Sequence, residues 1–285
     1  MTVVQDKQHT MDNGKVRARL EGVPETLLWT LWNRAVEAGH EDPVLDDPMA
    51  LRLVDSIDFP FEERFGAPHP LFAQIQGLRS VTFDRAVREY VADHPEATVV
   101  ALGEGLETGF WRVDNGRLRW LSVDLPEAAE LRRRLLPEHE RVRVLGCSAT
   151  DTSTWLDAVE DPAKGVVVTA QGLLMYLRPP EVRDLLAASA GALSGGAFVL
   201  DSMARWLTRA TRRGNMRIGT MPVPAMRWSM AADERHKLHT AHPGITDVRA
   251  LTMPRGRGVL GRLIEHQHRV PLFRSISPAV TLVRF

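Results

Sequence analysis

A glycine-rich loop followed by an acidic residue is the feature of this sequence best suited to chemistry. The loop, residues 103–109, has the pattern G-x-G-x-x-x-G and follows an apolar, β-branched run at 98–102. Glycines at 103 and 105 let the backbone turn sharply and approach a ligand with no Cβ in the way. Asp124 stands about 20 residues further on, at the end of a second apolar run, where a carboxylate accepts hydrogen bonds from ribose hydroxyls. Together they predict a nucleoside site.

The loop distinguishes only weakly between two nucleoside cofactors. Its spacing departs from the dinucleotide pattern G-x-G-x-x-G. Glu104 and Glu107 add negative charge, which repels a pyrophosphate but tolerates the ammonium and sulfonium groups of S-adenosylmethionine. A nicotinamide-dependent dehydrogenase is further disfavoured because the sequence has no Tyr-x-x-x-Lys pair. These details favour S-adenosylmethionine.

Strands and helices alternate from residue 97 onward, as expected of βαβ units with a parallel sheet. The carboxyl ends of such strands are where open sheets bind ligands, so the loop and Asp124 stand at the expected edge. We predict an α/β fold with an open, doubly wound, mostly parallel sheet. The predicted strands are 98–102, 119–124, 142–145, 166–170, 197–201 and 279–285, and the predicted helices between them are 127–135, 153–159 and 179–193.

The remaining segments have a different character. Residues 1–15 are polar and are expected to be disordered, and residues 16–95 read as helices without a convincing strand. Residues 96–285 form the α/β domain. Within it, 205–275 interrupt the alternation with Arg, Met, Pro and Gly, and we expect them to form a substrate cap. Residues 205–274 hold 14 Lys and Arg but only four Asp and Glu. This excess of positive charge suits either the binding of an anionic substrate or surface ion pairs with the rest of the chain, which is acidic.

Composition places the chain among ordinary globular enzymes. Hydrophobic residues make up 44% and charged residues 25%, with a formal net charge of zero, which gives no reason to expect a nucleic-acid or membrane partner. The single cysteine, Cys147, excludes an internal disulfide and suits a reducing compartment. The first residues have no apolar signal region, so a cytoplasmic protein is expected.

Three runs of sequence resemble the leucine carboxyl methyltransferase family. They are residues 99–108, 122–127 and 169–177, and the N-terminal run 22–31 extends the likeness to the polyketide carboxyl O-methyltransferases of the tetracenomycin type. The resemblance covers about residues 15–205. It implies a class I methyltransferase fold, Rossmann-like and seven-stranded, with S-adenosyl-L-methionine as cofactor.

The resemblance also implies roles for particular residues. Gly103 and Gly105 would contact the methionine part of the cofactor, Asp124 the ribose and Arg79 the cofactor carboxylate. Where the family has an Asp-Leu pair at the adenine, this chain has Ser148-Ala149, so either Ser148 or Asp151 must take the adenine amino group. Gln171 stands where some members have Glu. The implied cofactor-binding residues are Arg79, Gly103, Glu104, Gly105, Asp124, Leu125, Ser148, Ala149, Asp151, Gln171 and Gly172.

The acceptor of the methyl group is expected to be a carboxylate of a small or polyketide-type molecule. Methyl transfer is an in-line displacement at an activated methyl group, and a carboxylate needs no general base. Tyr176, Arg227 and Trp228 are the expected substrate contacts, and Trp206, Met216, Met221, Met226 and Met230 offer an apolar wall. A hydroxyl acceptor with a histidine base, and a cofactor-binding protein without catalysis, stay open as alternatives. No metal site is expected, although His236, His239 and His242 have helical spacing.

Overall fold

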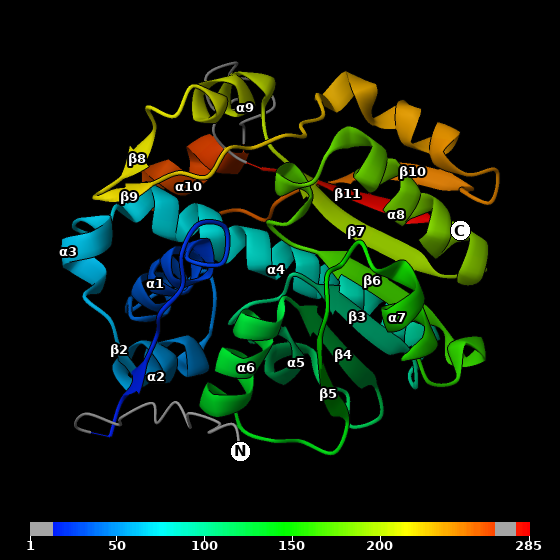
Figure 1. Ribbon diagram of the computed structural model, residues 1–285, viewed down its shortest axis with the longest axis horizontal. Coiled ribbons are helices and arrows are strands. Elements are labelled where there is room, and N and C mark those ends of the chain that lie inside the picture. Colours follow the sequence, from blue (N-terminus) through cyan, green and yellow to red (C-terminus); the bar gives the residue numbers. More distant parts are fainter. Residues whose placement is uncertain (1–13, 266–277) are drawn as a thin grey trace, which may run out of the picture.

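A central sheet of seven strands organises the molecule. The structure, a computed structural model, describes residues 14–265 and 278–285, so residues 1–13 of the expected disordered tail lie outside the described residues. Figure 1 shows the sheet with helices on both sides. Its order is β5 (Val142–Gly146), β4 (Arg119–Asp124), β3 (Thr98–Leu102), β6 (Val166–Ala170), β7 (Ala197–Ser202), β11 (Ala279–Arg284) and β10 (Asp247–Leu251).

The strand directions confirm the predicted fold class. The first five strands of that order are mutually parallel, and β11 lies antiparallel to both β7 and β10. All six predicted strands are present within one residue of their expected bounds. The sequence reading did not find β10, which lies inside the segment 205–275. This edge strand carries Asp247 and Arg249 and is mostly exposed, so it has no apolar run to identify it.

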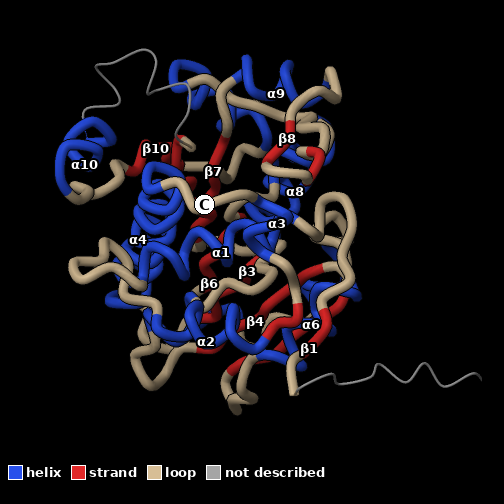
Figure 2. Tube along the Cα trace, turned by 90° about the vertical axis from the view of Figure 1, so that its left-hand side faces the viewer, coloured by secondary structure: helices blue, strands red, loops and turns tan. Residues whose placement is uncertain are grey.

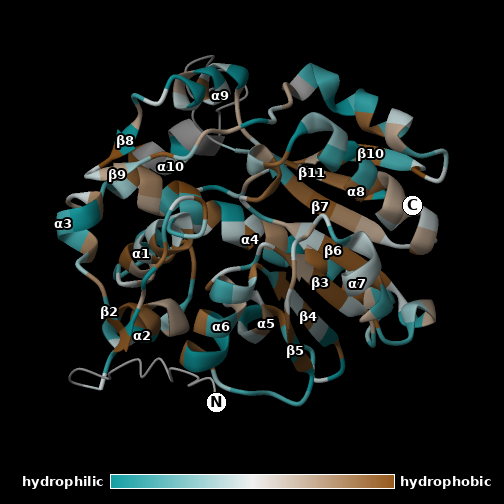
Figure 3. Ribbon diagram, in the orientation of Figure 1, coloured by the Kyte–Doolittle hydropathy of each residue, from teal (hydrophilic) through white to brown (hydrophobic). Residues whose placement is uncertain are grey.

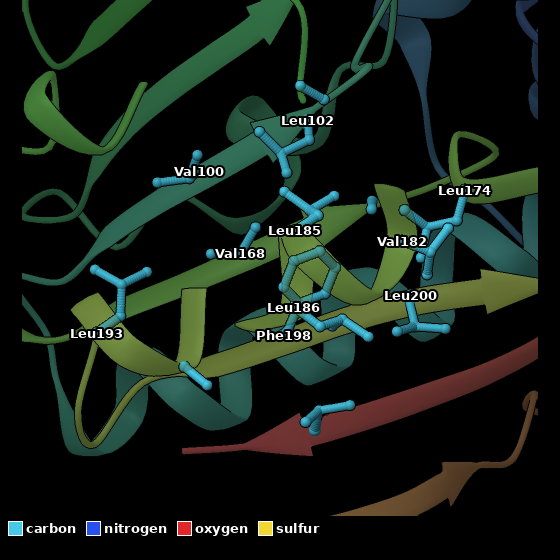
Figure 4. Close-up of a cluster of buried hydrophobic side chains, with 14 of the residues drawn as sticks. Val100, Leu102, Val168, Leu174, Val182, Leu185, Leu186, Leu193, Phe198 and Leu200 are labelled. Atoms are coloured by element: carbon cyan, nitrogen blue, oxygen red, sulfur yellow. The ribbon is translucent and has the colours of Figure 1, made fainter. Parts of the chain in front are cut away.

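Both faces of the sheet are buried, because successive side chains of a strand point to opposite faces. Val99 and Ala101 of β3 pack with the long helix α4 (Pro70–Asp93), whereas Val100 and Leu102 pack with α8 (Pro179–Ala192). Figure 4 shows Phe198 of β7 next to α8 in the second layer. In Figure 2 the strands lie between α4 and α8, and Figure 3 shows the hydrophobic strands enclosed by more polar helices.

Local sequence explains most of the helix boundaries. Asp47 caps the second helix by accepting a hydrogen bond from Ala50 N at 3.1 Å, and Pro48 occupies the first helical position. The remaining α-helices are α1 (Thr26–Ala38), α2 (Pro48–Ser56), α3 (Phe61–Phe65), α5 (Gly109–Val113), α6 (Pro126–Leu135), α7 (Thr152–Asp157), α9 (Arg205–Arg212) and α10 (Gly258–Glu265). The 3₁₀ helices are Pro162–Lys164, Leu174–Tyr176 and Ala232–Ala241.

Two short strand pairs in the described part of the chain lie outside the sheet. The N-terminal region, expected to be helical throughout, contains the parallel pair β1 (Val16–Arg17) and β2 (Ile57–Asp58). Two-residue strands are too short to show an alternating pattern, which is why this pair was not predicted. The antiparallel pair β8 (Arg217–Ile218) and β9 (Met221–Pro222) lies in the predicted cap segment.

A buried group of charged side chains joins the N-terminal helices to the α/β domain. Arg34 of α1 lies 2.6 Å from Asp47, and both side chains are 1% exposed. Arg112 of α5 lies 3.0 Å from Asp47 and 2.7 Å from Asp84 of α4. Arg34 also donates to the carbonyl oxygen of Leu106 in the glycine loop at 2.7 Å. We call Arg34, Asp47, Asp84, Glu107 and Arg112 the charge cluster. It fixes the loop relative to α1, α2 and α4.

We predict that Arg34→Met destabilises the protein by about 3–5 kcal/mol, because it leaves the Asp47 carboxylate buried with one partner fewer. The change in the free energy of unfolding can be measured by urea denaturation. Arg117→Met is the matched control, since Arg117 pairs with Glu96 at the surface, where a pair contributes about 1 kcal/mol or less. Equal effects of the two substitutions would contradict the structural role given to the charge cluster.

Candidate functional site

The carboxyl ends of β3, β4, β5 and β6 converge on a cavity of about 290 Å³. This is the topological switch point of the sheet, since the chain builds outward from β3 to β5 and then returns to place β6 on the other side of β3. All of the predicted cofactor-binding residues except Asp151 line this cavity, together with Tyr176. We call it the nucleoside cavity. Its lining also includes Val23, Pro24, Thr26, Leu27, Thr30, Glu107, Leu173 and Leu177, which were not predicted.

Two glycines of the loop are required by both conformation and space. Gly103 has φ of 61° and Gly105 has φ of 55°, in the left-handed region that other residues rarely adopt. A Cβ at Gly103 would lie 2.9 Å from Leu173 Cδ1, and a Cβ at Gly105 would lie 2.9 Å from Leu27 Cβ. The loop therefore packs closely against Leu173 on one side and Leu27 on the other.

Asp124 is held at the end of β4 by the loop that it faces. Its Oδ2 accepts a hydrogen bond from Gly105 N at 2.6 Å, and its Oδ1 accepts one from Leu125 N at 2.7 Å. Burial raises the pKa of Asp124 above its ordinary value, although both N–H groups act in the opposite direction. Each carboxylate oxygen keeps lone pairs for a further donor, so the orientation suits recognition of two adjacent hydroxyls.

The structure distinguishes between Ser148 and Asp151, the two residues that the sequence offered as partners of the adenine amino group. Ser148 lines the nucleoside cavity, and its hydroxyl lies 2.8 Å from Thr150 Oγ1. Asp151 does not line the cavity. It caps α7, accepting hydrogen bonds from Thr154 Oγ1 at 2.7 Å and from Ser153 Oγ at 3.1 Å. Including Asp151 among the cofactor contacts is not supported by its position, because its carboxylate serves the first turn of the helix.

The two glutamates of the loop are neutralised by arginines. Glu104 lies 3.0 Å from Arg132 and accepts a hydrogen bond from Trp120 Nε1 at 3.0 Å. Burial raises its pKa, and Arg132 acts against that effect. For Glu107, burial also opposes ionisation, but the attraction of Arg34 and Arg112 prevails and lowers the pKa to about 2. The sequence argument from a negatively charged loop is therefore wrong in detail, because both carboxylates lie in pairs with buried guanidinium groups.

Gln171 connects the charge cluster to the cavity. Its Nε2 donates to Glu107 Oε1 at 2.8 Å and to Ser80 Oγ at 3.1 Å. Both bonds use the amide nitrogen, so the carbonyl oxygen is the group that remains for a ligand.

Asp201, at the end of β7, was not predicted and connects two cavity residues. It lies 3.2 Å from Arg79 Nη1, and it accepts a hydrogen bond from Gly172 N at 2.8 Å. Burial raises the pKa of Asp201, and Arg79 opposes that rise. The sequence signal that could have identified Asp201 is its place near the end of a strand, the place that Asp124 has in β4.

A second cavity, of about 550 Å³, adjoins the first. The two cavities share Thr26, Thr30, Arg79, Gly172 and Tyr176. We call the larger one the aromatic cavity, because Trp29, Trp32, Phe65, Phe72 and Trp206 line it. Of the predicted apolar wall, Trp206, Met216, Met221 and Met226 line this cavity. The predicted cap thus contributes α9 and the β8–β9 pair to its wall.

Two predicted substrate contacts lie elsewhere. Arg227 is exposed, and Trp228 packs partly buried against the core on the α8 side of the sheet. Neither lines the two cavities. The backbone explains their position, since the N–H groups of both residues donate to the carbonyl oxygen of Met175, at 2.6 Å and 3.1 Å. This contact holds the backbone of both residues against Met175.

The described residues contain neither a metal-binding cluster nor a helix able to span a membrane. Within 14–265 and 278–285, no group of three or more His, Cys, Asp and Glu side chains is placed to hold a metal ion. In the same ranges, no helix combines the length and apolarity that crossing a bilayer requires.

Comparison with known proteins identifies the family. A profile described as leucine carboxyl methyltransferase matches residues 27–190, which include α4 and most of the residues that line the nucleoside cavity. The chain belongs to the leucine carboxyl methyltransferase family. It is accordingly a methyltransferase that depends on S-adenosylmethionine.

Two curated relatives support this assignment. The chain is 36% identical over 192 residues to the tetracenomycin polyketide synthesis O-methyltransferase TcmP of Streptomyces glaucescens, an alignment that covers 67% of this chain and 70% of the relative. It is 30% identical over 191 residues to the S-adenosyl-L-methionine-dependent methyltransferase dpfgK of Gibberella zeae, covering 62% and 63% respectively.

A solved structure supports the fold. A putative methyltransferase from Thermobifida fusca superposes with a TM-score of 0.57 at 16% identity, covering 90% of this chain and 93% of the other.

The residues of the nucleoside cavity fit S-adenosylmethionine. A carboxylate with two oriented oxygens, Asp124, lines the cavity together with the apolar residues Leu125 and Ala149, which suits a ribose joined to a flat base. The guanidinium of Arg79 lines the same cavity with its Nε unbonded, which suits a carboxylate.

Proposed function

We propose that this enzyme transfers the methyl group of S-adenosylmethionine to a carboxylate of a planar small molecule. The cofactor would bind in the nucleoside cavity and the acid in the aromatic cavity. The observation that carries the proposal is the composition of the second cavity. Among the described residues that line it, none is Asp, Glu, Lys or Cys, and His69 lies at its exposed rim. A carboxylate is already ionised at neutral pH and needs no base, whereas a phenol or alcohol needs one.

The cofactor roles are proposed from the contacts of the cavity. Asp124 would accept hydrogen bonds from the ribose, and Gly103 and Gly105 would leave room for the methionine part. Arg79 would pair with the cofactor carboxylate, and the Ser148 hydroxyl would face the adenine edge. When bound, S-adenosylmethionine supplies a methyl group that is already activated. The contribution of the protein is then orientation and exclusion of water.

Tyr176 is proposed to orient the acceptor. It lines both cavities, and burial raises the pKa of its phenol above the ordinary value. The phenol therefore stays protonated at neutral pH and can donate a hydrogen bond to an acceptor oxygen, but it cannot remove a proton from it. Beside it, Arg79 would add positive charge at the junction of the cavities, which favours an anionic acceptor.

A hydroxyl acceptor is the second candidate, and one residue favours it. His69 lines the aromatic cavity at its exposed rim. Its Nδ1 accepts a hydrogen bond from Leu71 N at 3.3 Å, so the neutral ring carries its proton on Nε2, and His69 would act as a base through Nδ1 once that bond is released. The name of the Streptomyces relative, an O-methyltransferase, is compatible with either acceptor.

We predict that Asp124→Asn weakens binding of S-adenosylhomocysteine about 10-fold or more, because an amide replaces one of the two acceptor oxygens with a donor. Calorimetric titration measures the affinity. Asp151→Asn is the matched control and should leave the affinity within about twofold. A larger loss from Asp151→Asn than from Asp124→Asn would contradict the placement of the nucleoside.

We predict that the methylated product is an ester. Mild alkali should release its methyl group, and His69→Gln should keep nearly all of the wild-type kcat, because no proton has to be removed from a carboxylate. Mass spectrometry of the product before and after alkali treatment measures the release of the methyl group. Steady-state kinetics measures the kcat of His69→Gln. An alkali-stable methyl group together with a loss of about 100-fold in His69→Gln would instead establish a hydroxyl acceptor.

A further inference from the structure

Three polar side chains from separate elements meet beside the nucleoside cavity. Ser80 lies on α4, Glu107 lies in the glycine loop, and Gln171 directly follows β6. The Ser80 hydroxyl donates to Glu107 Oε1 at 2.9 Å, and Gln171 Nε2 donates to the same oxygen at 2.8 Å. Gln171 Nε2 also donates to Ser80 Oγ at 3.1 Å. Glu107 and Gln171 line the cavity, and Ser80 is fully buried.

Glu107 can only accept hydrogen bonds in this arrangement, because its carboxylate is ionised. Burial opposes the ionisation, but the attraction of Arg34 and Arg112 prevails and lowers the pKa to about 2. The second oxygen, Oε2, accepts hydrogen bonds from Arg112 Nη2 at 3.1 Å and from Thr108 N at 3.3 Å. Since an ionised carboxylate has no proton to donate, the amide of Gln171 has to turn its nitrogen toward Glu107. Its carbonyl oxygen therefore points away from Glu107.

Gln171 stands next to the residue that is proposed to hold the cofactor carboxylate. Gly172, which follows it, donates through its N–H to Asp201 at 2.8 Å. A Cβ at Gly172 would lie 3.2 Å from Arg79 Nη1, so the chain touches the guanidinium at this point. The carboxylate and the ammonium of an amino acid are attached to one carbon atom. A ligand whose carboxylate pairs with Arg79 therefore brings its ammonium to this segment, and an ammonium needs acceptors because it has three donors.

We infer that Glu107 is a positioning residue, which turns the Gln171 amide so that its oxygen accepts a hydrogen bond from the ammonium group of the cofactor. Glu107 acts through Gln171 and not by its own contact with the ammonium. One member of the charge cluster thus has a role in binding besides its role in the fold. The inference rests on the proposed function, since it takes the nucleoside cavity as the cofactor site and Arg79 as the partner of the cofactor carboxylate.

The substitution Glu107→Gln should turn the Gln171 amide over. Arg112 and Thr108 N are donors, so they hold the oxygen of the introduced amide. Its nitrogen then faces Ser80 and Gln171, and Gln171 offers its oxygen to residue 107 and its nitrogen to the cavity. A donor in that place repels an ammonium.

The fold should tolerate this substitution, because the introduced amide has the size and shape of the carboxylate. Arg34 keeps Asp47 as a partner, and Arg112 keeps Asp47 and Asp84. The substitution Gln171→Leu removes the acceptor oxygen directly and leaves every ion pair of the charge cluster in place.

The test compares two ligands that share the nucleoside and differ in the amino-acid part. S-adenosylhomocysteine carries the ammonium and the carboxylate, and methylthioadenosine carries neither. Calorimetric titration gives the ratio of their dissociation constants, which we call the amino-acid preference. It should fall about 10-fold in Glu107→Gln and in Gln171→Leu, because each variant takes an acceptor from a charged donor. In the double variant it should fall no further than in Gln171→Leu alone, since Glu107 acts through Gln171.

Asp84→Asn is the matched control for a general effect of the charge cluster. Like Glu107, Asp84 pairs with Arg112, here at 2.7 Å, and among the described residues it makes no hydrogen bond to Gln171. This variant should lower the stability while the amino-acid preference stays within about twofold of the wild-type value. An unchanged preference in either Glu107→Gln or Gln171→Leu overturns the inference, as does a further fall in the double variant.

Asp124→Asn separates this inference from the proposed placement of the cofactor. Both ligands carry the ribose, so the variant should weaken both of them and keep the amino-acid preference. If it does so while the preference is unchanged in the Glu107 and Gln171 variants, this inference alone fails. If Asp124→Asn weakens neither ligand, the placement of the cofactor fails and the inference fails with it.

Discussion

The pairing of buried charges behind the glycine loop is the constraint on which the other features depend. Arg34, Asp47 and Arg112 are all buried, and removing a charge from water is costly unless the partners are fixed in place. The fixed partners come from α1, the start of α2, α4 and α5, so these elements can adopt only one arrangement around the loop. The loop conformation, with Gly105 donating to Asp124, is then set before a ligand arrives.

The same arrangement gives the N-terminal helices a second role. One side of α1 contributes Arg34 to the charge cluster, and another contributes Trp29 and Asn33 to the aromatic cavity. In α4, Asp84 belongs to the cluster, while Arg79 lines both cavities. Under the proposed function, the helices that position the cofactor loop would also form the wall against which an acceptor lies. This shared use of two helices would then align the acceptor with the methyl donor.

Sequence reasoning found the parts that depend on local pattern and on chain order. Strand β3 follows from its apolar, β-branched run, and Asp124 follows from its place at the end of a strand. Strand β10 was missed because an exposed edge strand has no apolar pattern. Arg227 was misplaced because the direction of a side chain in an irregular segment depends on tertiary contacts, here with the carbonyl of Met175.

The central claim is that the loop, Asp124 and Arg79 form a site for S-adenosylmethionine. Calorimetric titration of the wild-type protein with S-adenosylhomocysteine, with NADH as the comparison ligand, tests it most directly. We expect a dissociation constant on the order of micromolar for S-adenosylhomocysteine and no measurable heat with NADH. Binding of NADH in place of S-adenosylhomocysteine, or of neither ligand, would contradict the account.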